Sequence, residues 1–201
     1  MNDTNYWRNK WVGKRISPPN TFARRAFELI KKAKGPRTLV DVGCGDGRDS
    51  IFFSERGLKV TALDLSESGI EKLKGRDKRI KCVLGDIRKH VFPPDSFDVV
   101  YAHLSLHYFD DHATRRIFKK LFRVLRRGGL IFVKCKATDD PLFGKGEKVG
   151  ENMYRSGHTR HFFTTEYMRE NLKDFEIIRV RKTRSSYDGF PSAFIEAIAS
   201  K

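Results

Sequence analysis

The sequence predicts a single α/β domain with a mostly parallel sheet. Short apolar strands alternate with helix-forming segments along the chain, and this alternation is typical of parallel βαβ units. A glycine-rich turn follows the first predicted strand, as in sheets that bind ligands at their strand ends. The 201 residues match the length of one domain and contain no internal repeat, so residues 1–201 are expected to fold as one unit.

The first half of the chain contains most of the predicted parallel strands. A helix is predicted over Thr21–Lys34, where apolar side chains share one face until Gly35-Pro36 ends it. Strands are then predicted at residues 37–42, 58–63, 80–84 and 97–101, with helices over residues 49–56 and from residue 66. Each strand is short and contains β-branched or aromatic residues, which favours a buried position in a sheet.

The second half continues the alternation and then closes the sheet. Asp110 or Asp111 is the predicted cap of a helix that ends at Gly128-Gly129, and a fifth strand follows over residues 130–134. The remaining predicted elements are a helix from Thr164 or Thr165 through Leu172 and a closing pair of strands at residues 175–182 and 193–200, joined by residues 185–191.

Two segments lie outside this alternation. Residues 136–163 show no strong periodicity, and a loop of this length is usually a lid or a binding loop, so we expect a substrate lid. Residues 1–20 contain Tyr6, Trp7 and Trp11 in a basic stretch. These large apolar groups are expected either to cap the site or to pack against the sheet edge.

The chain is strongly basic. It has 41 Lys and Arg residues against 25 Asp and Glu residues, a formal charge of +16 and a pI near 9.9. Such a field attracts nucleic acids and anionic small molecules. The alternative is an ordinary solvated surface, and the basic run Arg115–Arg123 fits it, because Ile117 and Leu121 form a core-facing stripe between the cations.

The cysteines and the hydropathy of the sequence argue against a disulfide-bonded, metal-binding, secreted or membrane protein. The three cysteines, Cys44, Cys82 and Cys135, are far apart and form no Cys-x-x-Cys pair, so neither a disulfide nor a metal site is predicted. The sequence has no apolar run long enough for a signal peptide or a membrane span, and we expect a cytoplasmic protein without a membrane partner. The oligomeric state does not follow from the sequence.

The turn from Asp41 to Gly47 places three glycines between a strand and a helix. Glycine permits positive φ and close approach of the backbone to a ligand, and the helix N-terminus presents free N–H groups. A dinucleotide fingerprint requires a third glycine where Arg48 stands, so a nicotinamide-dependent oxidoreductase is the alternative interpretation. A phosphate-binding P-loop fits less well, because no Gly-Lys-Ser/Thr follows.

Two carboxylates follow the next strands along the chain. Asp64 ends the second predicted strand and can accept hydrogen bonds from both hydroxyls of a ribose. Asp86 ends the third and can accept from the amine of an adenine. For either residue alone, an ordinary cap or turn after a strand is the more common explanation. Together with the glycine turn, however, they predict an adenosine site.

These motifs in this order resemble those of the class I S-adenosylmethionine-dependent methyltransferases, over roughly residues 39–133. Residues 41–47, 60–65 and 85–87 are similar to the first three motifs of that family, and residues 97–101 and 125–130 to its fourth strand and the turn into its fifth. The run from Gly45 to Ser50 is most similar to the branch that includes tellurite-resistance and related small-molecule methyltransferases.

The resemblance implies a Rossmann-like, doubly wound sheet of seven strands with an antiparallel last strand, and S-adenosyl-L-methionine as methyl donor. It implies that the glycine turn holds the methionine part, that Asp64 binds the ribose, and that Asp86 and Ile87 bind the adenine. The residues expected to bind the cofactor are Asp41, Gly43, Cys44, Gly45, Gly47, Asp64, Leu65, Asp86, Ile87, Ala102 and His103.

Three side chains are candidates for a catalytic part at the acceptor: His107, Tyr108 and His161. Thiolates and oxyanions attack a methyl sulfonium unaided, whereas a neutral hydroxyl or an ammonium needs a base. His107 is either such a base or a buried imidazole, and Tyr108 is either functional or part of the wall. The run Gly157–Phe163 either grips an anionic or aromatic acceptor or packs its phenylalanines on the core.

The function expected from these observations is in-line methyl transfer to a small-molecule acceptor. RNA or protein is the alternative acceptor, because of the basic charge. Residues 102–105 lack the Asn/Asp-Pro-Pro-aromatic motif typical of enzymes that methylate base amines, and the chain has no appended RNA-binding module. A non-catalytic cofactor-binding protein is a further alternative, since a fold does not by itself imply catalysis.

Overall fold

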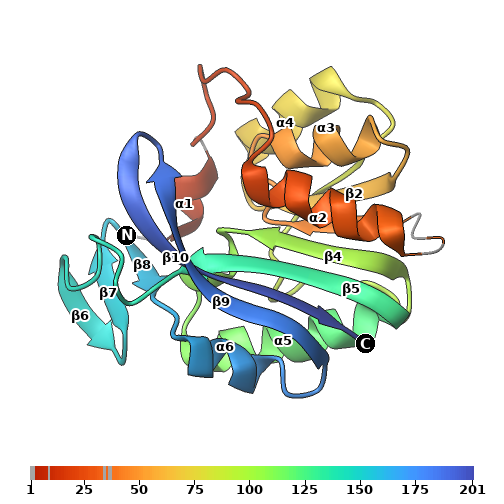
Figure 1. Ribbon diagram of the computed structural model, residues 1–201. Helices are drawn as coiled ribbons and strands as arrows, with labels where there is room; N and C mark the ends of the chain where they lie inside the picture. The colour runs from red at the N-terminus through yellow and green to blue at the C-terminus, as the bar shows by residue number, and fades with distance from the viewer. Residues whose placement is uncertain (1–2, 9, 34, 36–37) are drawn as a thin grey trace.

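The structure is a computed structural model that describes residues 3–8, 10–33, 35 and 38–201. Its strands, labelled as in Figure 1, are β1 (Thr38–Val42), β2 (Lys59–Asp64), β3 (Lys81–Leu84), β4 (Phe97–His103), β5 (Leu125–Lys136), β6 (Glu147–Gly150), β7 (Met153–Ser156), β8 (His158–His161), β9 (Glu176–Tyr187) and β10 (Phe190–Ser200). Its helices are α1 (Asp3–Arg8), α2 (Thr21–Lys32), α3 (Arg48–Ser54), α4 (Glu67–Arg76), α5 (Asp111–Val124) and α6 (Thr165–Asn171), with a 3₁₀ turn at Leu106–Tyr108.

The main sheet has seven strands in the order β3-β2-β1-β4-β5-β10-β9. The strands from β3 to β5 are mutually parallel, and β10 is antiparallel to both of its neighbours. The direction of winding reverses between β1 and β4, which is the point where ligands bind in such sheets. This topology confirms the predicted fold class, a doubly wound and mostly parallel sheet with an antiparallel last strand.

Helices cover both faces of this sheet. As Figure 1 shows, α2, α3 and α4 lie on one face, and α5 and α6 lie on the other. Side chains of β1 alternate between them: Leu39 packs in the cluster with α2 and α3, whereas Val40 and Val42 pack in the cluster with α5 and α6. The core therefore consists of two apolar layers, one on each side of the sheet.

Polar caps fix where several helices begin. Asn20 accepts a hydrogen bond from the amide of Ala23 at 2.8 Å at the start of α2. At the start of α5 the cap is Asp110, one of the two predicted candidates, which accepts from the amide of Ala113 at 2.7 Å. Thr164 caps α6 in the same way.

The boundary between α5 and β5 differs from the prediction. The helix ends at Val124 and not at Gly128-Gly129, because Leu125 is extended, fully buried and paired with Phe97 of β4. Gly128 has a φ of 73° and lies where the register between β4 and β5 shifts. The two glycines therefore belong to an irregularity in the strand rather than to a helix end.

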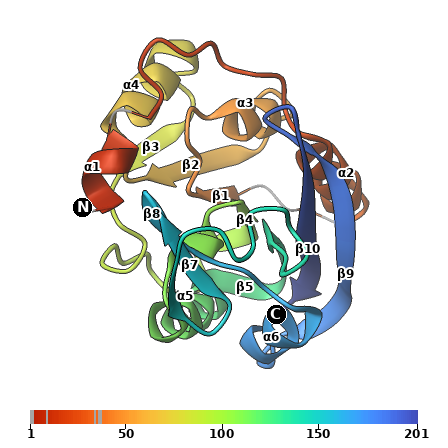
Figure 2. The same ribbon diagram turned by 90° about the vertical axis from the view of Figure 1, so that its left-hand side faces the viewer.

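Residues 136–163 contain a small antiparallel sheet, β6-β7-β8, instead of a loop without regular structure. Its strands have four residues each, which is too short to show a clear periodicity in the sequence. Helix α1, which the sequence analysis did not predict, contacts β8 of this small sheet through aromatic rings and lies near it in Figure 2.

The hairpin of β9 and β10 is longer than predicted and is joined by Asp188-Gly189 rather than by residues 185–191. Both turn residues have positive φ, 50° and 81°, as in the type I′ turn that matches the twist of a hairpin. Strand β5 pairs with β10 only from Phe194 onward, so the tip of the hairpin projects beyond the end of β5.

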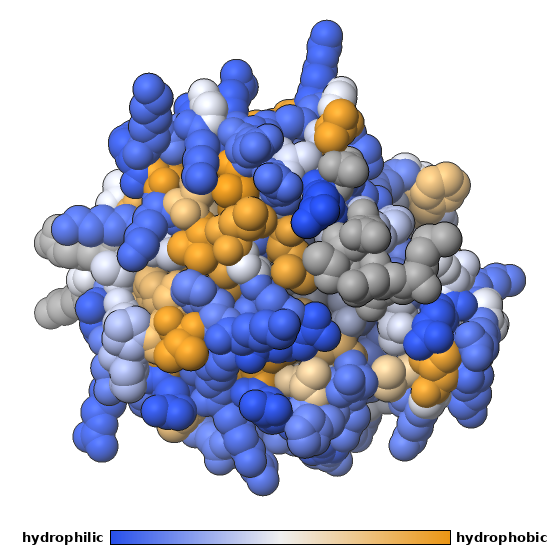
Figure 3. Space-filling model, turned by 180° about the vertical axis from the view of Figure 1, so that it is seen from behind, coloured by the Kyte–Doolittle hydropathy of each residue, from blue (hydrophilic) through white to orange (hydrophobic). Residues whose placement is uncertain are grey.

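Hydrophilic side chains dominate the face shown in Figure 3, with smaller apolar areas between them. On α5, Arg116 and Lys119 are exposed whereas Ile117 and Leu121 are buried, so the charges of this helix lie on its solvated side. None of the helices in the described part of the chain is both long and apolar enough to cross a membrane.

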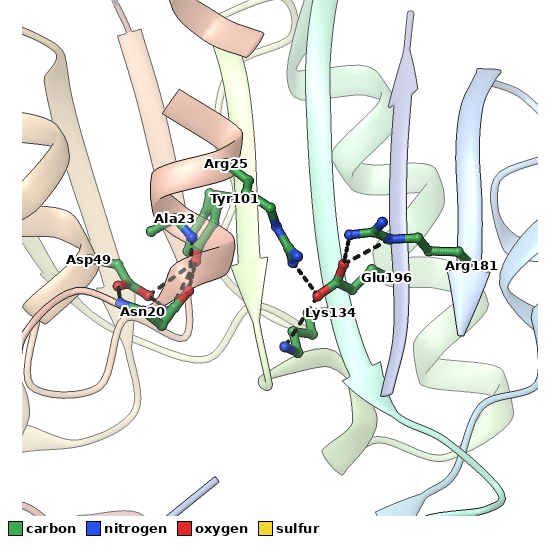
Figure 4. Close-up of polar contacts among 8 residues, drawn as sticks. All are labelled: Asn20, Ala23, Arg25, Asp49, Tyr101, Lys134, Arg181 and Glu196. Carbon is green, nitrogen blue, oxygen red and sulfur yellow. Dashed lines mark hydrogen bonds and ion pairs between the residues drawn. The ribbon is translucent and has the colours of Figure 1, made fainter. Parts of the chain in front are cut away.

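One buried carboxylate joins α2 to three strands. Glu196 of β10 is 4% exposed and forms ion pairs with Arg25 of α2, with Lys134 of β5 at 3.2 Å and with Arg181 of β9 at 3.0 Å (Figure 4). Burial acts to raise the pKa of Glu196, but the attraction of these cations outweighs it and the pKa is lowered. The ammonium of Lys134 is itself buried and depends on this carboxylate.

We predict that Glu196→Ala lowers the free energy of unfolding by about 3–5 kcal/mol, because it leaves the buried charge of Lys134 without a partner. Urea denaturation measures this loss. The control is Glu28→Ala, which breaks an exposed pair with Lys31 and is expected to change the stability by less than about 1 kcal/mol. Equal effects of the two substitutions would contradict the structural part assigned to Glu196.

Candidate active site

A cavity of about 730 Å³ opens where β1, β2, β4 and β5 end. It lies at the switch point between β1 and β4, where the floor is formed by the turns that follow the strands. Its upper walls come from the N-terminal segment, including Trp7 and Trp11, and from the hairpin tip, including Tyr187. Segments far apart in the sequence thus enclose one space beside the sheet.

The glycine turn fits tightly against its neighbours. The amides of Gly43 and Cys44 donate to the carbonyl of Leu63 at 2.7 and 3.1 Å, which binds the turn to the end of β2. Gly43 has a φ of 76°, and a Cβ there would lie 2.3 Å from Cβ of Ser105. At Gly45, with a φ of 59°, a Cβ would lie 2.7 Å from the Trp11 ring. Both positions therefore require glycine.

Asp64 is oriented by the backbone on both sides. One carboxylate oxygen accepts from the amide of Gly45 and the other from the amide of Ser66, each at 2.7 Å. Burial raises the pKa of Asp64 even though these amides favour the ionised form. Asp64 and the neighbouring Leu65 both line the cavity.

Carboxylates form the floor of the cavity. Asp41 is 2% exposed and accepts a hydrogen bond from the hydroxyl of Ser50 at 2.6 Å. Burial, and next the charge of Asp49, raise the pKa of Asp41 to about 8. The Asp49 carboxylate accepts from the side chain of Asn20 and, at 3.1 Å, from the hydroxyl of Tyr101 (Figure 4). Carboxyl groups buried so close together favour a nearby cation, which would offset the raised pKa of Asp41, and they disfavour a nearby phosphate.

Most of the residues expected to bind the cofactor line this one cavity: Asp41, Gly43, Cys44, Gly45, Asp64, Leu65, Ile87 and His103. Three others are absent from its wall within the described residues. Asp86 is paired with Arg88 at 2.6 Å, a Cβ at Gly47 would lie 2.4 Å from Leu73 of α4, and Ala102 is fully buried. Gly47 and Ala102 therefore pack the fold rather than face the cavity.

The rings of His107 and Tyr108 are in contact, with centroids 4.2 Å apart, but only one of the three catalytic candidates lines the cavity. Tyr108 lines the cavity, but His107 and His161 are 1% and 4% exposed and do not belong to its wall in the described part of the chain. Burial lowers the pKa of His107 well below its usual value. The ring of His161 packs against Phe163 and Tyr167. For His107, this position fits the alternative interpretation as a buried imidazole.

Two further residues line the cavity, His158 and Arg160. They belong to the run Gly157–Phe163, which the sequence offered as an acceptor-gripping segment, but they were not among the three catalytic candidates. Both lie on β8, two positions apart, and alternate residues of a strand point to the same side. His161 falls on the opposite side for the same reason. The run Gly157–Phe163 contains these polar residues, but only its assignment as a strand shows which of them share the side that faces the cavity.

Aromatic rings cover the cavity from above. Trp7 of α1 packs against Tyr108, with the ring centroids 4.6 Å apart, and Tyr6 packs against His158 at 4.5 Å. Burial, and next the charge of Arg160, lower the pKa of His158 to about 4, so its imidazole is neutral at neutral pH. The N-terminal segment and β8 thus meet over Tyr108 and limit the access of water.

A comparison with protein families matches residues 39–129 to a family model described as a methyltransferase domain. This range begins in β1 and ends within β5. It therefore contains the glycine turn and the ends of β1, β2 and β4, but not the end of β5, the small sheet or the closing hairpin.

Curated relatives cover part of the chain. The chain is similar to malonyl-[acyl-carrier protein] O-methyltransferase from Salmonella typhimurium. The two sequences are 34% identical over 94 residues, which cover 47% of this chain and 37% of that protein. It is also similar to trans-aconitate 2-methyltransferase from Methylobacterium radiotolerans, with 31% identity over 115 residues, 55% of this chain and 43% of that protein. The chain thus spans less than half the length of these two relatives.

A solved structure matches nearly the whole chain. It is the 1,6-didemethyltoxoflavin-N1-methyltransferase from Burkholderia thailandensis, with bound 1,6-didemethyltoxoflavin and S-adenosylhomocysteine. The match has a TM-score of 0.71 and 20% identity, and it covers 99% of this chain and 84% of that one. At this identity the similarity shows a shared fold.

The buried acid at Asp41 predicts a pH dependence of stability. Because its pKa in the folded protein is about 8, against an ordinary 3.8, its contribution to stability is full below about pH 4 and is lost as the pH rises through 8. We expect the stability of the wild type relative to Asp41→Asn to fall over this interval in urea denaturation.

The control is Asp77→Asn. Its bonds to Arg79 lower the pKa of Asp77, so its contribution is present above about pH 4 and is lost as the pH falls. The two differences should therefore have opposite slopes with pH. A flat or rising difference for Asp41 would show that this carboxyl is not held in its neutral form.

Proposed function

We propose that the protein transfers the methyl group of S-adenosyl-L-methionine to a small-molecule acceptor, because residues 39–129 match a family model described as a methyltransferase domain. The similarity to methyltransferases with small organic acceptors, trans-aconitate and 1,6-didemethyltoxoflavin, supports an acceptor of this size. Methyl transfer from a sulfonium is an in-line displacement, so the protein must mainly align the two reactants.

The observation that carries this proposal is the acidic floor beside the glycine turn. A dinucleotide would place its pyrophosphate at this turn, beside the buried carboxyl groups of Asp41 and Asp49, and a nearby anion would oppose their ionisation still further. S-adenosyl-L-methionine instead carries a sulfonium and an ammonium, and both are cations. The chemistry of the residues present therefore fits this cofactor and disfavours a nicotinamide dinucleotide.

Each part of the cofactor has a partner on the cavity wall. We assign the methionine part to the turn from Gly43 to Gly45 with Asp41, and the ribose to Asp64. Leu65 and Ile87 supply apolar contacts for the adenine. Asp86 would reach the adenine amine only if its pair with Arg88 opened. When bound, the cofactor supplies a methyl group on a good leaving group.

The protein's own part is then orientation and exclusion of water. We propose that residues 1–20 act as a cap and residues 136–163 as a substrate lid on a single domain formed by residues 1–201. Tyr6 and Trp7 both pack against His158, with ring centroids 4.5 and 5.4 Å apart, and hold these two segments together over the cavity. A dry, closed site strengthens the electrostatic contacts to both reactants and prevents hydrolysis.

The direct test incubates the purified protein with methyl-labelled S-adenosyl-L-methionine and a cell extract, and then counts label in small metabolites, RNA and protein. We expect label in the small metabolites. Label confined to RNA or protein would contradict the acceptor class and would make the basic surface a substrate-binding site. Absence of transfer to all three, with the cofactor bound, would indicate a non-catalytic binding protein.

Asp64→Ala tests the cofactor site separately from catalysis. Losing hydrogen bonds to a charged group is expected to weaken the binding of S-adenosylhomocysteine by about tenfold or more in titration calorimetry. Asp77→Ala, which removes a buried aspartate that pairs with Arg79 away from the cavity, should leave the affinity unchanged. Unchanged affinity for Asp64→Ala would remove the assigned ribose contact.

A further inference from the structure

The cavity contains a guanidinium without a carboxylate partner. Arg160 of β8 is half-buried and lines the cavity, and no ion pair links it to an acid in the described part of the chain. It bonds instead to the hydroxyl of Tyr108, which is neutral. By contrast, Lys136 on the same wall is committed to Asp140 at 2.7 Å. A guanidinium left with free donors is suited to a carboxylate or another oxyanion.

Next to it, the imidazole of His158 has unused hydrogen-bonding capacity. The residue is 3% exposed and lines the cavity, yet neither ring nitrogen has a partner among the described residues. A neutral imidazole has one donor and one acceptor, and buried polar atoms of this kind are normally satisfied. The missing partner is therefore expected to come from a ligand in the cavity.

The surrounding walls are flat and apolar. The ring of His158 lies 4.5 Å from Tyr6, 5.4 Å from Trp7 and 5.2 Å from Tyr108, measured between centroids. Tyr187 of the hairpin tip lines the same cavity. Aromatic walls favour a planar group that can stack or pack edge to face. The charged and polar groups of Arg160 and His158 thus lie beside a cluster of aromatic rings that lines the same cavity.

We propose that the methyl acceptor is a small planar organic carboxylate, whose anionic group is bound by Arg160 and His158 and whose flat body packs among Tyr6, Trp7 and Tyr108. This inference rests on the proposed function and names the substrate class of the same cavity. Arg160 is a substrate-binding residue here. The buried carboxyl groups of Asp41 and Asp49 favour a cation over a second anion, so we assign the carboxylate of the acceptor to Arg160 and His158 and not to this part of the cavity wall.

Both tryptophans of the chain line the cavity, so their fluorescence reports on its occupancy. The experiment first measures binding of S-adenosylhomocysteine and then titrates the saturated protein with benzoate and 4-hydroxybenzoate. The matched probes are benzamide and 4-hydroxybenzamide, which have the same shape without the charge. We expect the carboxylates to bind at least about tenfold more tightly than the amides.

Three variants show which residue causes the preference for carboxylates over amides. Arg160→Gln should abolish the preference for carboxylates while leaving the affinity for S-adenosylhomocysteine unchanged. His158→Phe keeps a ring against Tyr6 and Trp7 and should reduce the preference only in part. The control is Arg155→Gln, on β7 of the same small sheet but outside the cavity wall, which should behave as the wild type.

The outcomes distinguish this inference from the proposed function. If S-adenosylhomocysteine binds but carboxylates and amides bind equally, or neither binds at millimolar concentration, the acceptor class is wrong while the proposed function stands. A preference that survives Arg160→Gln also overturns the inference. If S-adenosylhomocysteine itself does not bind, the failure lies with the proposed function.

Discussion

The carboxylate of Asp64 fixes the two turns on which the cavity depends. One of its oxygens is bound by the amide of Gly45, after β1, and the other by the amide of Ser66, which caps α4. Two βα connections that are distant in the sequence are therefore attached to one rigid group. Gly43 then approaches Ser105 so closely that a side chain has no room, which sets the position of the segment after β4 as well.

The acidic floor next to this turn works against the stability of the unliganded protein. Asp41 and Asp49 are buried side by side, and burial raises the pKa of each. Hydrogen bonds from Ser50, Asn20 and Tyr101 compensate only part of this unfavourable arrangement. Proteins accept such local conflicts mainly at functional sites, and the proposed cofactor, which carries two cationic groups, would resolve this one.

Features with a strong local signal could be predicted from the sequence. The βα alternation, the cap at Asp110 and the glycine turn each depend on a few neighbouring residues. What was missed depends on distant contacts or on short elements. Helix α1 has six residues, and the strands of the small sheet have four, so neither shows a period. Because β8 could not be predicted as a strand, the sequence did not show that His158 and His161 lie on opposite sides of it, with only His158 on the cavity wall.

The position of β10 in the sheet has a consequence for how the chain is assembled. This strand follows the others in the sequence but lies between β5 and β9, in the interior of the sheet. Until it is synthesised and inserted, β5 presents an unpaired edge, and the hairpin tip cannot close the cavity. A chain emerging from the ribosome therefore passes through a stage with an exposed strand edge, when it depends most on protection from aggregation by chaperones.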